Sequence, residues 1–166
     1  MSLSASSAHS CDCSPSILVV DDIYFNMMAV RLMIEDKFSM GVSEALDGNI
    51  AVDMFKAGLD KPCGCPDRAF KLIFMDMSMP IMGGLEASQA IFKMVEAFPE
   101  VETTIVILTA FTNEKLFQDC KELGIKKCIG KPLKYEALHE CMHRYLYGVD
   151  LEEYKILFKD KFGKEY

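Results

Sequence analysis

Apolar positions along this chain gather in short runs separated by longer periodic stretches. The runs are ILVV at 17–20, FKLIFM at 70–75, TTIVILTA at 103–110 and the weaker KKCIG at 126–130, while SMGVSEAL at 39–46 alternates apolar with polar residues. Short runs rich in β-branched side chains are typical of strands. The pattern therefore predicts five strands.

The stretches between these runs have helical periodicity. Helices are predicted just after residue 22 with Phe25, Ala29, Leu32 and Met33 on the apolar face, then at 47–58, from 84 to about 98, at 113–124, and at 134–147 with Leu138, Cys141, Met142 and Tyr145 at core spacing. Asn113 has the character of a helix cap, and Gly58 and Gly124 of helix ends. Strands and helices thus alternate along the chain.

This alternation predicts an α/β fold with one parallel sheet covered by helices on both faces. Right-handed crossovers restrict the topology that five β-α units can adopt. The folded domain is expected at 16–147, after a Ser/Ala-rich segment at 1–15 that is expected to be disordered. The charged tail at 148–166 is compatible with one more helix, and 59–69 is predicted to be an inserted loop, far from the carboxyl ends of the strands.

Composition narrows the class of protein. With 166 residues, 51% of them hydrophobic, the chain suits one domain with a substantial core, and no apolar run is long enough for a membrane span. The start lacks the charged-then-apolar pattern of a secretion signal. A formal charge of −7 argues against a nucleic-acid surface.

The cysteines favour a reducing compartment. Their number is seven, which is odd, and several lie inside apolar periodic segments, as reduced thiols of a cytoplasmic protein do. Cys11 with Cys13 and Cys63 with Cys65 form two Cys-x-Cys pairs. They leave open a zinc site as an alternative to ordinary loop thiols.

Five polar side chains stand where predicted strands end. Asp21 and Asp22 follow the first strand, Asp76 the third, Thr109 the fourth and Lys131 the fifth. In such sheets the carboxyl ends of the strands form the working site. Crowded carboxylates repel one another unless a cation joins them, and hard oxygen ligands suit Mg²⁺. An Asp pair after a strand can also simply cap the next helix, but all five residues together can bind a phosphoryl group on an Asp nucleophile.

Four segments resemble the receiver domain of two-component response regulators. They are VVDD, IFMDMSMPIMGGLEA, IVILTA and GKP, of which the second, with its D-x-x-M-P-x-M-x-G pattern, is the most specific. The resemblance covers 16–147 and is greatest for receivers attached to hybrid histidine kinases. It implies a flavodoxin-like, doubly wound five-stranded sheet with strand order 2-1-3-4-5.

The resemblance also implies a phosphoacceptor and a metal site. Asp76 is expected to accept a phosphoryl group from the phosphohistidine of a histidine kinase or a histidine phosphotransfer domain. Asp22 is expected to bind Mg²⁺ directly and Asp21 through water. Asp76 itself and the backbone carbonyl of Ser78 would complete the protein ligands.

The remaining implied roles belong to the phosphate contact and the switch. Lys131 is expected to pair with the phosphate and to precede a cis peptide bond at Pro132. Thr109 is expected to turn toward the phosphoryl group. The family usually has Tyr or Phe at the position of Cys128, so we expect coupling to pass through the 110–113 loop, with Phe111 as the ring, more than through Cys128.

The predicted function is a Mg²⁺-dependent receiver in a phosphorelay, whose phosphorylation changes partner binding. It would catalyse its own phosphorylation and dephosphorylation but turn over no small substrate. It is expected to be cytoplasmic, with no nucleic-acid or membrane partner for this chain. A homodimer and a hybrid-kinase parent are compatible with the resemblance, and no effector domain fits beside the receiver.

Three alternatives to this function differ in what they require of the sequence. A phosphate-independent pseudo-receiver that serves as a docking module is slightly favoured by Cys128, but the intact acids, the threonine and the lysine weigh strongly against it. A hydrolase with an Asp nucleophile would need a second acid where Ser78 stands. A flavin module would need a phosphate loop after the first strand, and none is present.

Two further groups carry weaker expectations. His139 and His143, one helical turn apart, are expected to be ordinary side chains on or near a helix surface. Met77, Met79 and Met82 are expected to line a partner face.

Overall fold

The computed structural model describes residues 16–63, 65 and 68–166. The predicted disordered segment 1–15, with Cys11 and Cys13, lies outside the described residues. The elements in chain order are β1 Ile17–Val20, α1 Tyr24–Phe38, β2 Ser43–Ala45, α2 Gly48–Leu59, β3 Leu72–Asp76, α3 Gly84–Val95, β4 Thr104–Thr109, α4 Glu114–Glu122, β5 Lys127–Gly130, α5 Tyr135–Cys141, a π-helical turn Met142–Leu146, and α6 Leu151–Phe162.

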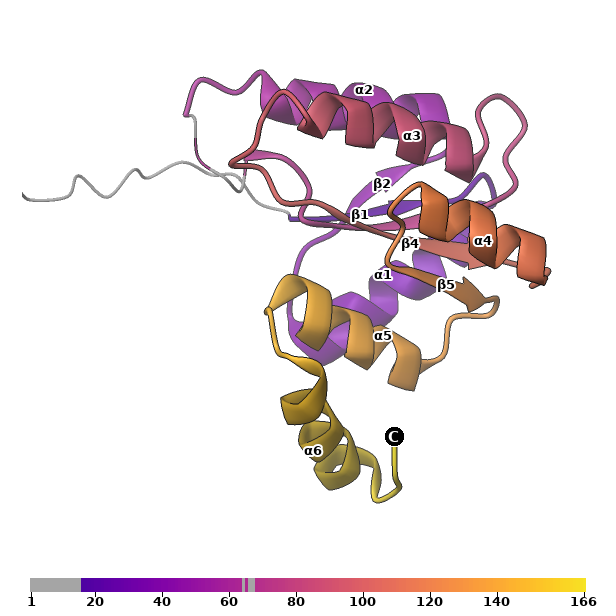
Figure 1. Ribbon diagram of the computed structural model, residues 1–166, viewed down its shortest axis with the longest axis vertical. Coiled ribbons are helices and arrows are strands. Elements are labelled where there is room, and N and C mark those ends of the chain that lie inside the picture. Colours follow the sequence, from indigo (N-terminus) through magenta and orange to yellow (C-terminus); the bar gives the residue numbers. More distant parts are fainter. Residues whose placement is uncertain (1–15, 64, 66–67) are drawn as a thin grey trace, which may run out of the picture.

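The five strands form one parallel sheet in the order β2-β1-β3-β4-β5 (Figure 1). Leu18 pairs with Ser43 on one side and with Ile73 on the other, and Ile107 pairs with Cys128 at the far edge. The predicted α/β class and the strand order 2-1-3-4-5 are confirmed. All five strands therefore place their carboxyl ends at one edge of the sheet.

Two hydrophobic cores lie on the two faces of the sheet because alternate strand residues point to opposite sides. Helices α2, α3 and α4 cover one face, while α1 and α5 cover the other (Figure 1). The first core includes Leu18, Val20, Phe55, Ile73, Ile91, Ile107 and Leu116, and the second includes Ile17, Val19, Ile34, Phe74, Val106, Leu138 and Met142. The sheet is thus dry on both sides, as its apolar strands predicted.

The predicted apolar face of α1 is wrong. Phe25 is 73% exposed and Leu32 is also exposed, whereas Met27, Val30 and Ile34 are buried against the sheet. Apolar side chains occur all round this helix, so their spacing alone selects no face. The buried side is decided by how the helix packs beneath β1 and beside α5.

Several element boundaries differ from the sequence pattern. The strand predicted at 39–46 is only Ser43–Ala45, whose three residues pair with Leu18–Val20 of β1. Ser39, with φ 52°, ends α1 in the left-handed conformation. The helix predicted at 134–147 is α-helical to Cys141 and then widens into the π-helical turn. Asn113 caps α4 as predicted, accepting a hydrogen bond from the backbone N–H of Leu116 at 2.8 Å.

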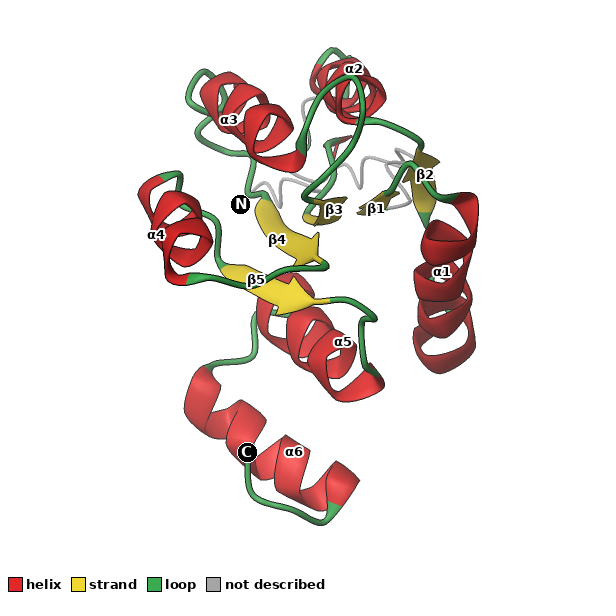
Figure 2. Ribbon diagram, turned by 90° about the vertical axis from the view of Figure 1, so that its right-hand side faces the viewer, coloured by secondary structure: helices red, strands yellow, loops and turns green. Residues whose placement is uncertain are grey.

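Helix α6 packs against α5 and extends beyond the α/β body (Figure 2). Tyr154 is fully buried and its hydroxyl lies 3.2 Å from Nδ1 of His139. Phe162 packs edge-on against the ring of His139, a residue that is 6% exposed. The expectation that His139 lies on or near the surface is therefore wrong, because α6 covers it, while His143 is half-buried.

No helix in the described part of the chain is long and apolar enough to cross a bilayer.

Candidate functional site

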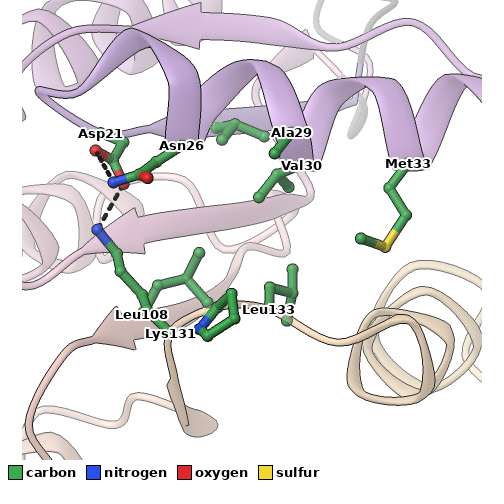
Figure 3. A pocket seen from close by; sticks show the side chains of 10 residues that line it. Asp21, Asn26, Ala29, Val30, Met33, Leu108, Lys131 and Leu133 are labelled. Atoms are coloured by element: carbon green, nitrogen blue, oxygen red, sulfur yellow. Dashed lines mark hydrogen bonds and ion pairs between the residues drawn. The ribbon is translucent and has the colours of Figure 1, made fainter.

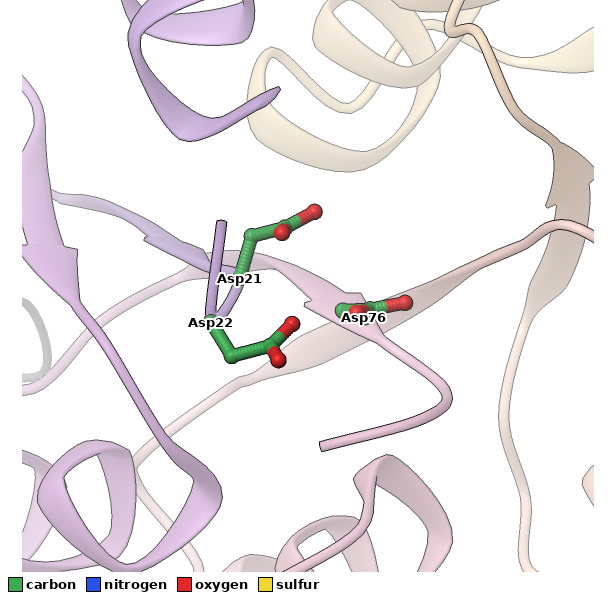
Figure 4. Close-up of side chains that lie close together, drawn as sticks. All are labelled: Asp21, Asp22 and Asp76. Carbon is green, nitrogen blue, oxygen red and sulfur yellow. The ribbon is translucent and has the colours of Figure 1, made fainter. Parts of the chain in front are cut away.

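Three carboxylates meet at the carboxyl edge of the sheet. Asp21 and Asp22 follow β1, and Asp76 is the last residue of β3 (Figure 4). One ligand oxygen from each lies within 4.8 Å of the others. Asp21 is 2% exposed and Asp76 is 5% exposed, whereas Asp22 faces solvent. The sequence prediction that these acids come together is thus matched by the geometry.

Lys131 joins two of these acids. It follows β5, and its Nζ lies 2.6 Å from Oδ2 of Asp21 and 2.8 Å from Oδ1 of Asp76. The peptide bond between Lys131 and Pro132 is cis, as expected. One ammonium therefore neutralises part of the charge of three carboxylates, and two negative charges remain.

Asp21 is held from the side of α1 as well (Figure 3). Its Oδ1 accepts hydrogen bonds from the backbone N–H of Ile23 at 2.9 Å and from Nδ2 of Asn26 at 3.2 Å. With Lys131 on Oδ2, both oxygens of Asp21 have protein donors. Asp22 is the more open of the adjacent pair.

Burial and charge act against each other at this site. Burial raises the pKa of Asp76 above its ordinary value, although the hydrogen bond and charge of Lys131 act in the other direction. Burial also opposes the charge on Lys131, but its hydrogen bonds to Asp21 and Asp76 outweigh that effect and raise its pKa. Lys131 therefore stays an ammonium at neutral pH.

The loop between β3 and α3 requires glycine at position 84, which packs against the backbone of Asp76. A Cβ on Gly84 would come within 2.3 Å of the backbone oxygen of Asp76, so α3 can begin there only without a side chain. Gly84 also donates its N–H to the carbonyl of Met77 at 3.0 Å. The backbone N–H of Ser78 lies 3.4 Å from Oδ1 of Asp76, and Ser78 itself is exposed. The loop thus turns back over the acid that precedes it.

A fourth acid, Asp47, supports this loop and was missed from the sequence. It is buried, and its Oδ1 caps α2 by accepting from the backbone N–H of Asn49 at 3.2 Å. The same carboxylate accepts from the backbone N–H groups of Met82 at 3.1 Å and Ile81 at 3.2 Å. Its position before a helix suggests a cap, but no local pattern indicates the contacts with a loop 34 and 35 residues away.

Thr109 and Phe111 form the opposite wall. The Thr109 hydroxyl donates to the carbonyl of Phe111 at 2.8 Å and lies 3.2 Å from its N–H. Thr109 is buried, but Phe111 is 82% exposed. The hydroxyl is therefore engaged with its own loop, and the ring points outward.

Cys128 lies away from the acids. Its thiol faces the core beneath α4 and donates to Sγ of Cys120. The three methionines of the β3–α3 loop, Met77, Met79 and Met82, are half-buried against the same core. Their predicted role on a partner face stays a prediction.

An apolar cavity of about 340 Å³ lies beside Lys131, between α1 and the start of α5 (Figure 3). Asp21, Asn26 and Lys131 stand at one end of it, and Val30 and Met33 line the other. The side chain of Lys131 thus lines this apolar cavity, and its amine contacts Asp21 and Asp76 at the polar end.

The donor set fits a hard divalent cation. Asp21, Asp22 and Asp76 are the one group of three or more metal-competent side chains found in the described ranges. Carboxylates with two uncompensated charges suit Mg²⁺, which binds through one or two carboxylates and keeps several waters. Cys63 and Cys65, with sulfurs 3.4 Å apart, form no such group within the described residues.

Comparison with known proteins gives a family match over most of the chain. The model of the response regulator receiver domain matches residues 17–143. The osmosensing histidine protein kinase SLN1 of Saccharomyces cerevisiae is 30% identical over 125 residues, which are 75% of this chain and 10% of that protein. The chain thus spans about a tenth of this curated relative.

Solved structures agree in fold. The receiver domain of the histidine kinase CKI1 from Arabidopsis thaliana, complexed with Mg²⁺ and BeF₃⁻, matches with a TM-score of 0.67 and 25% identity, covering 75% of this chain and 87% of that one. A chain in the complex of the Saccharomyces cerevisiae histidine phosphotransfer protein Ypd1 with the receiver domain of Ssk1 matches with a TM-score of 0.69 and 22% identity, covering 84% and 95%.

Proposed function

This chain belongs to the response regulator receiver domain family, and from that premise we propose that Asp76 accepts a phosphoryl group from a phosphohistidine. The observation that carries the proposal is the position of Lys131, whose amine bridges Asp21 and Asp76. From this position the amine can pair with the carboxylate of Asp76 before transfer and with the phosphoryl oxygens on Asp76 after it. The docking-module alternative is not favoured, since it requires neither the amine nor three acids.

Asp22 and Asp76, with Asp21 behind them, would hold Mg²⁺. The bound ion would offset negative charge on the phosphoryl group during transfer. The exposed position of Asp22 and the two protein donors on Asp21 support the expected division, in which Asp22 contacts the ion and Asp21 acts through water. The CKI1 receiver, a relative with 25% identity, was solved with Mg²⁺.

The transfer needs little more from the protein than positioning and charge. The hydrogen bonds to the Asp76 carboxylate from the described residues both fall on Oδ1, so Oδ2 is the oxygen for attack. A bond forms between Oδ2 and phosphorus while the bond from phosphorus to the histidine nitrogen breaks. Lys131 stabilises the charge on the phosphoryl oxygens.

Phosphorylation would then compete for the Thr109 hydroxyl. That hydroxyl donates to the Phe111 carbonyl, and a phosphoryl oxygen on Asp76 offers a stronger, charged acceptor. When the Thr109 hydroxyl leaves the Phe111 carbonyl, the loop that carries the exposed Phe111 ring would be free to move. On this account Thr109→Ala changes the affinity of the phosphorylated chain for its partner more than Cys128→Ala does, and equal effects would contradict it.

The phosphodonor is expected to be a histidine kinase or a histidine phosphotransfer domain. The solved complex of Ypd1 with the Ssk1 receiver supports this choice of partner class through a shared fold. We place the reaction in the cytoplasm, because Cys120, Cys128 and Cys141 are free thiols and suit a reducing compartment.

Transfer from a ³²P-labelled phosphotransfer domain tests this function. The label is expected on the native chain in the presence of Mg²⁺ and to be absent from Asp76→Asn, which keeps the shape of the side chain. Lys131→Ala is expected to be labelled much more slowly. Label on Asp76→Asn equal to that on the native chain would overturn the assignment.

A further inference from the structure

Two cysteine thiols on neighbouring elements lie almost at bonding distance. Cys120 on α4 and Cys128 on β5 have their sulfur atoms 2.7 Å apart. The sulfurs of Cys63 and Cys65, only two residues apart in the chain, are 3.4 Å apart. A disulfide bond is about 2.05 Å long, so the first pair need close by only about 0.7 Å.

The backbone holds this pair in place. Both thiols face the core that lies beneath α2, α3 and α4. The backbone N–H of Ile125 donates to the carbonyl of Cys120 at 2.9 Å, which fixes the short connection from α4 to β5. Cys128 pairs with Ile107 in the sheet. The two sulfurs are therefore brought together by the fold and not by flexible loops.

We propose that Cys120 and Cys128 are a reversible disulfide modification site whose oxidant is a small-molecule disulfide such as glutathione disulfide. The half-buried Cys128 loses its proton, and its sulfur attacks one sulfur of glutathione disulfide, which releases one glutathione. Cys120 then loses its proton and attacks the Cys128 sulfur, which releases the second glutathione. Two protein thiols are oxidised and one glutathione disulfide is reduced to two thiols.

The surroundings of the pair make this site slow and selective. Cys120 is buried, so only Cys128 can begin the exchange. Burial, with the contact from Cys120, raises the pKa of the Cys128 thiol to about 12. Since the thiolate is the nucleophile, the rate should rise about tenfold for each pH unit in the neutral and mildly alkaline range.

The bond would link α4 to β5 close to Lys131 and to the loop that carries Phe111. Cys128 stands three residues before Lys131, and α4 follows directly on the loop of Phe111. A covalent link here would restrain any movement of α4 relative to the sheet. That consequence for signalling rests on the proposed function, whereas formation of the bond does not.

The test uses the full native chain in glutathione redox buffers of increasing oxidation. After equilibration the remaining thiols are blocked with N-ethylmaleimide, and the protein is cut with trypsin without reduction. The expected product links peptide 116–121 to peptide 128–134, which carry one cysteine each. The link should disappear in Cys120→Ser and in Cys128→Ser and remain in Cys141→Ser, whose thiol is buried on the other face of the sheet.

The linked peptides found after oxidation decide whether Cys120 and Cys128 form the site. A 116–121/128–134 link that reverses with dithiothreitol supports the site. Thiols of Cys120 and Cys128 that stay reduced at the most oxidising ratio, that stop at mixed disulfides with glutathione, or that link instead to Cys63 or Cys65 overturn it. The mapping on the native chain needs no variant to fold.

A second measurement separates the bond from the signalling proposal. In the oxidised chain, hydrogen exchange of the α4 amides should slow by about tenfold relative to the reduced chain. Phosphorylation of Asp76 in the two forms is then compared. A mapped bond in the oxidised chain, together with a reduced chain that takes no phosphate, would refute the proposed function and leave the disulfide site standing.

Discussion

Asp47 provides the most specific prediction about how the phosphoacceptor loop is held. Its carboxylate caps α2 through Asn49 and accepts two backbone hydrogen bonds from Ile81 and Met82 in the β3–α3 loop. Asp47→Ala removes both acceptor oxygens and with them all three hydrogen bonds. Asp47→Asn keeps the Oδ1 acceptor for Asn49 and Met82 but turns an amide donor toward the N–H of Ile81.

The expected magnitudes follow from these contacts. Loss of a helix cap costs about 1 kcal/mol of unfolding free energy. Loss of the acceptor for each of the two loop N–H groups costs about 1 kcal/mol, at the low end because water can reach the exposed Ile81. Asp47→Ala should therefore destabilise the fold by about 3 kcal/mol, and Asp47→Asn by about 1 kcal/mol.

Urea unfolding followed by far-ultraviolet circular dichroism measures both variants, since the chain has no tryptophan for fluorescence. The dependence of the unfolding free energy on urea concentration should stay unchanged, so the shift of the midpoint gives the difference in stability between the variants. Equal destabilisation by Ala and Asn, or a loss below about 1 kcal/mol for Asp47→Ala, would refute the role given to the two loop contacts.

Two further predictions concern a glycine and a buried histidine. Gly84→Ala should leave a folded chain whose phosphorylation rate falls about tenfold or more, because the added Cβ would lie 2.3 Å from the backbone oxygen of Asp76. The control Gly83→Ala, whose Cβ would have its nearest neighbour at 3.4 Å, should be phosphorylated at the native rate. Equal rates in the two variants would count against the close approach. Burial beneath α6 lowers the pKa of His139 from 6.5 to about 4, so the unfolded state binds the proton first as the pH falls. Stability should thus be complete above about pH 6.5 and decline toward pH 4 by at most about 3 kcal/mol. Urea unfolding at several pH values should show this decline in the native chain and a smaller one in His139→Leu, and identical profiles would contradict it.

The acidic site was predictable from sequence because topology alone gathers it. Once the strands are parallel and neighbours, Asp21, Asp76, Thr109 and Lys131 share one edge whatever their side-chain rotamers. Charge alone assigns the amine of Lys131 to the acids, but its bridge between Asp21 and Asp76 depends on a side-chain conformation that the sequence does not specify.

Other features depend on contacts that have no local signal. The buried face of α1 was mispredicted because Phe25 and Leu32 fit the helical period as well as Met27 and Val30 do. The burial of His139 depends on how α6 docks, which the charged tail sequence does not indicate. The approach of Cys120 to Cys128 likewise follows from the close connection between α4 and β5.

The central claim is that Asp76 takes one phosphoryl group with the help of a metal bound by its neighbouring acids. The intact mass of the native chain after incubation with acetyl phosphate and Mg²⁺ tests it most directly. We expect the mass of one added phosphoryl group, absent when Mg²⁺ is chelated and absent in Asp76→Asn. An adduct of the same size on folded Asp76→Asn, or none on the folded native chain with either acetyl phosphate or a phosphohistidine donor, would contradict the account.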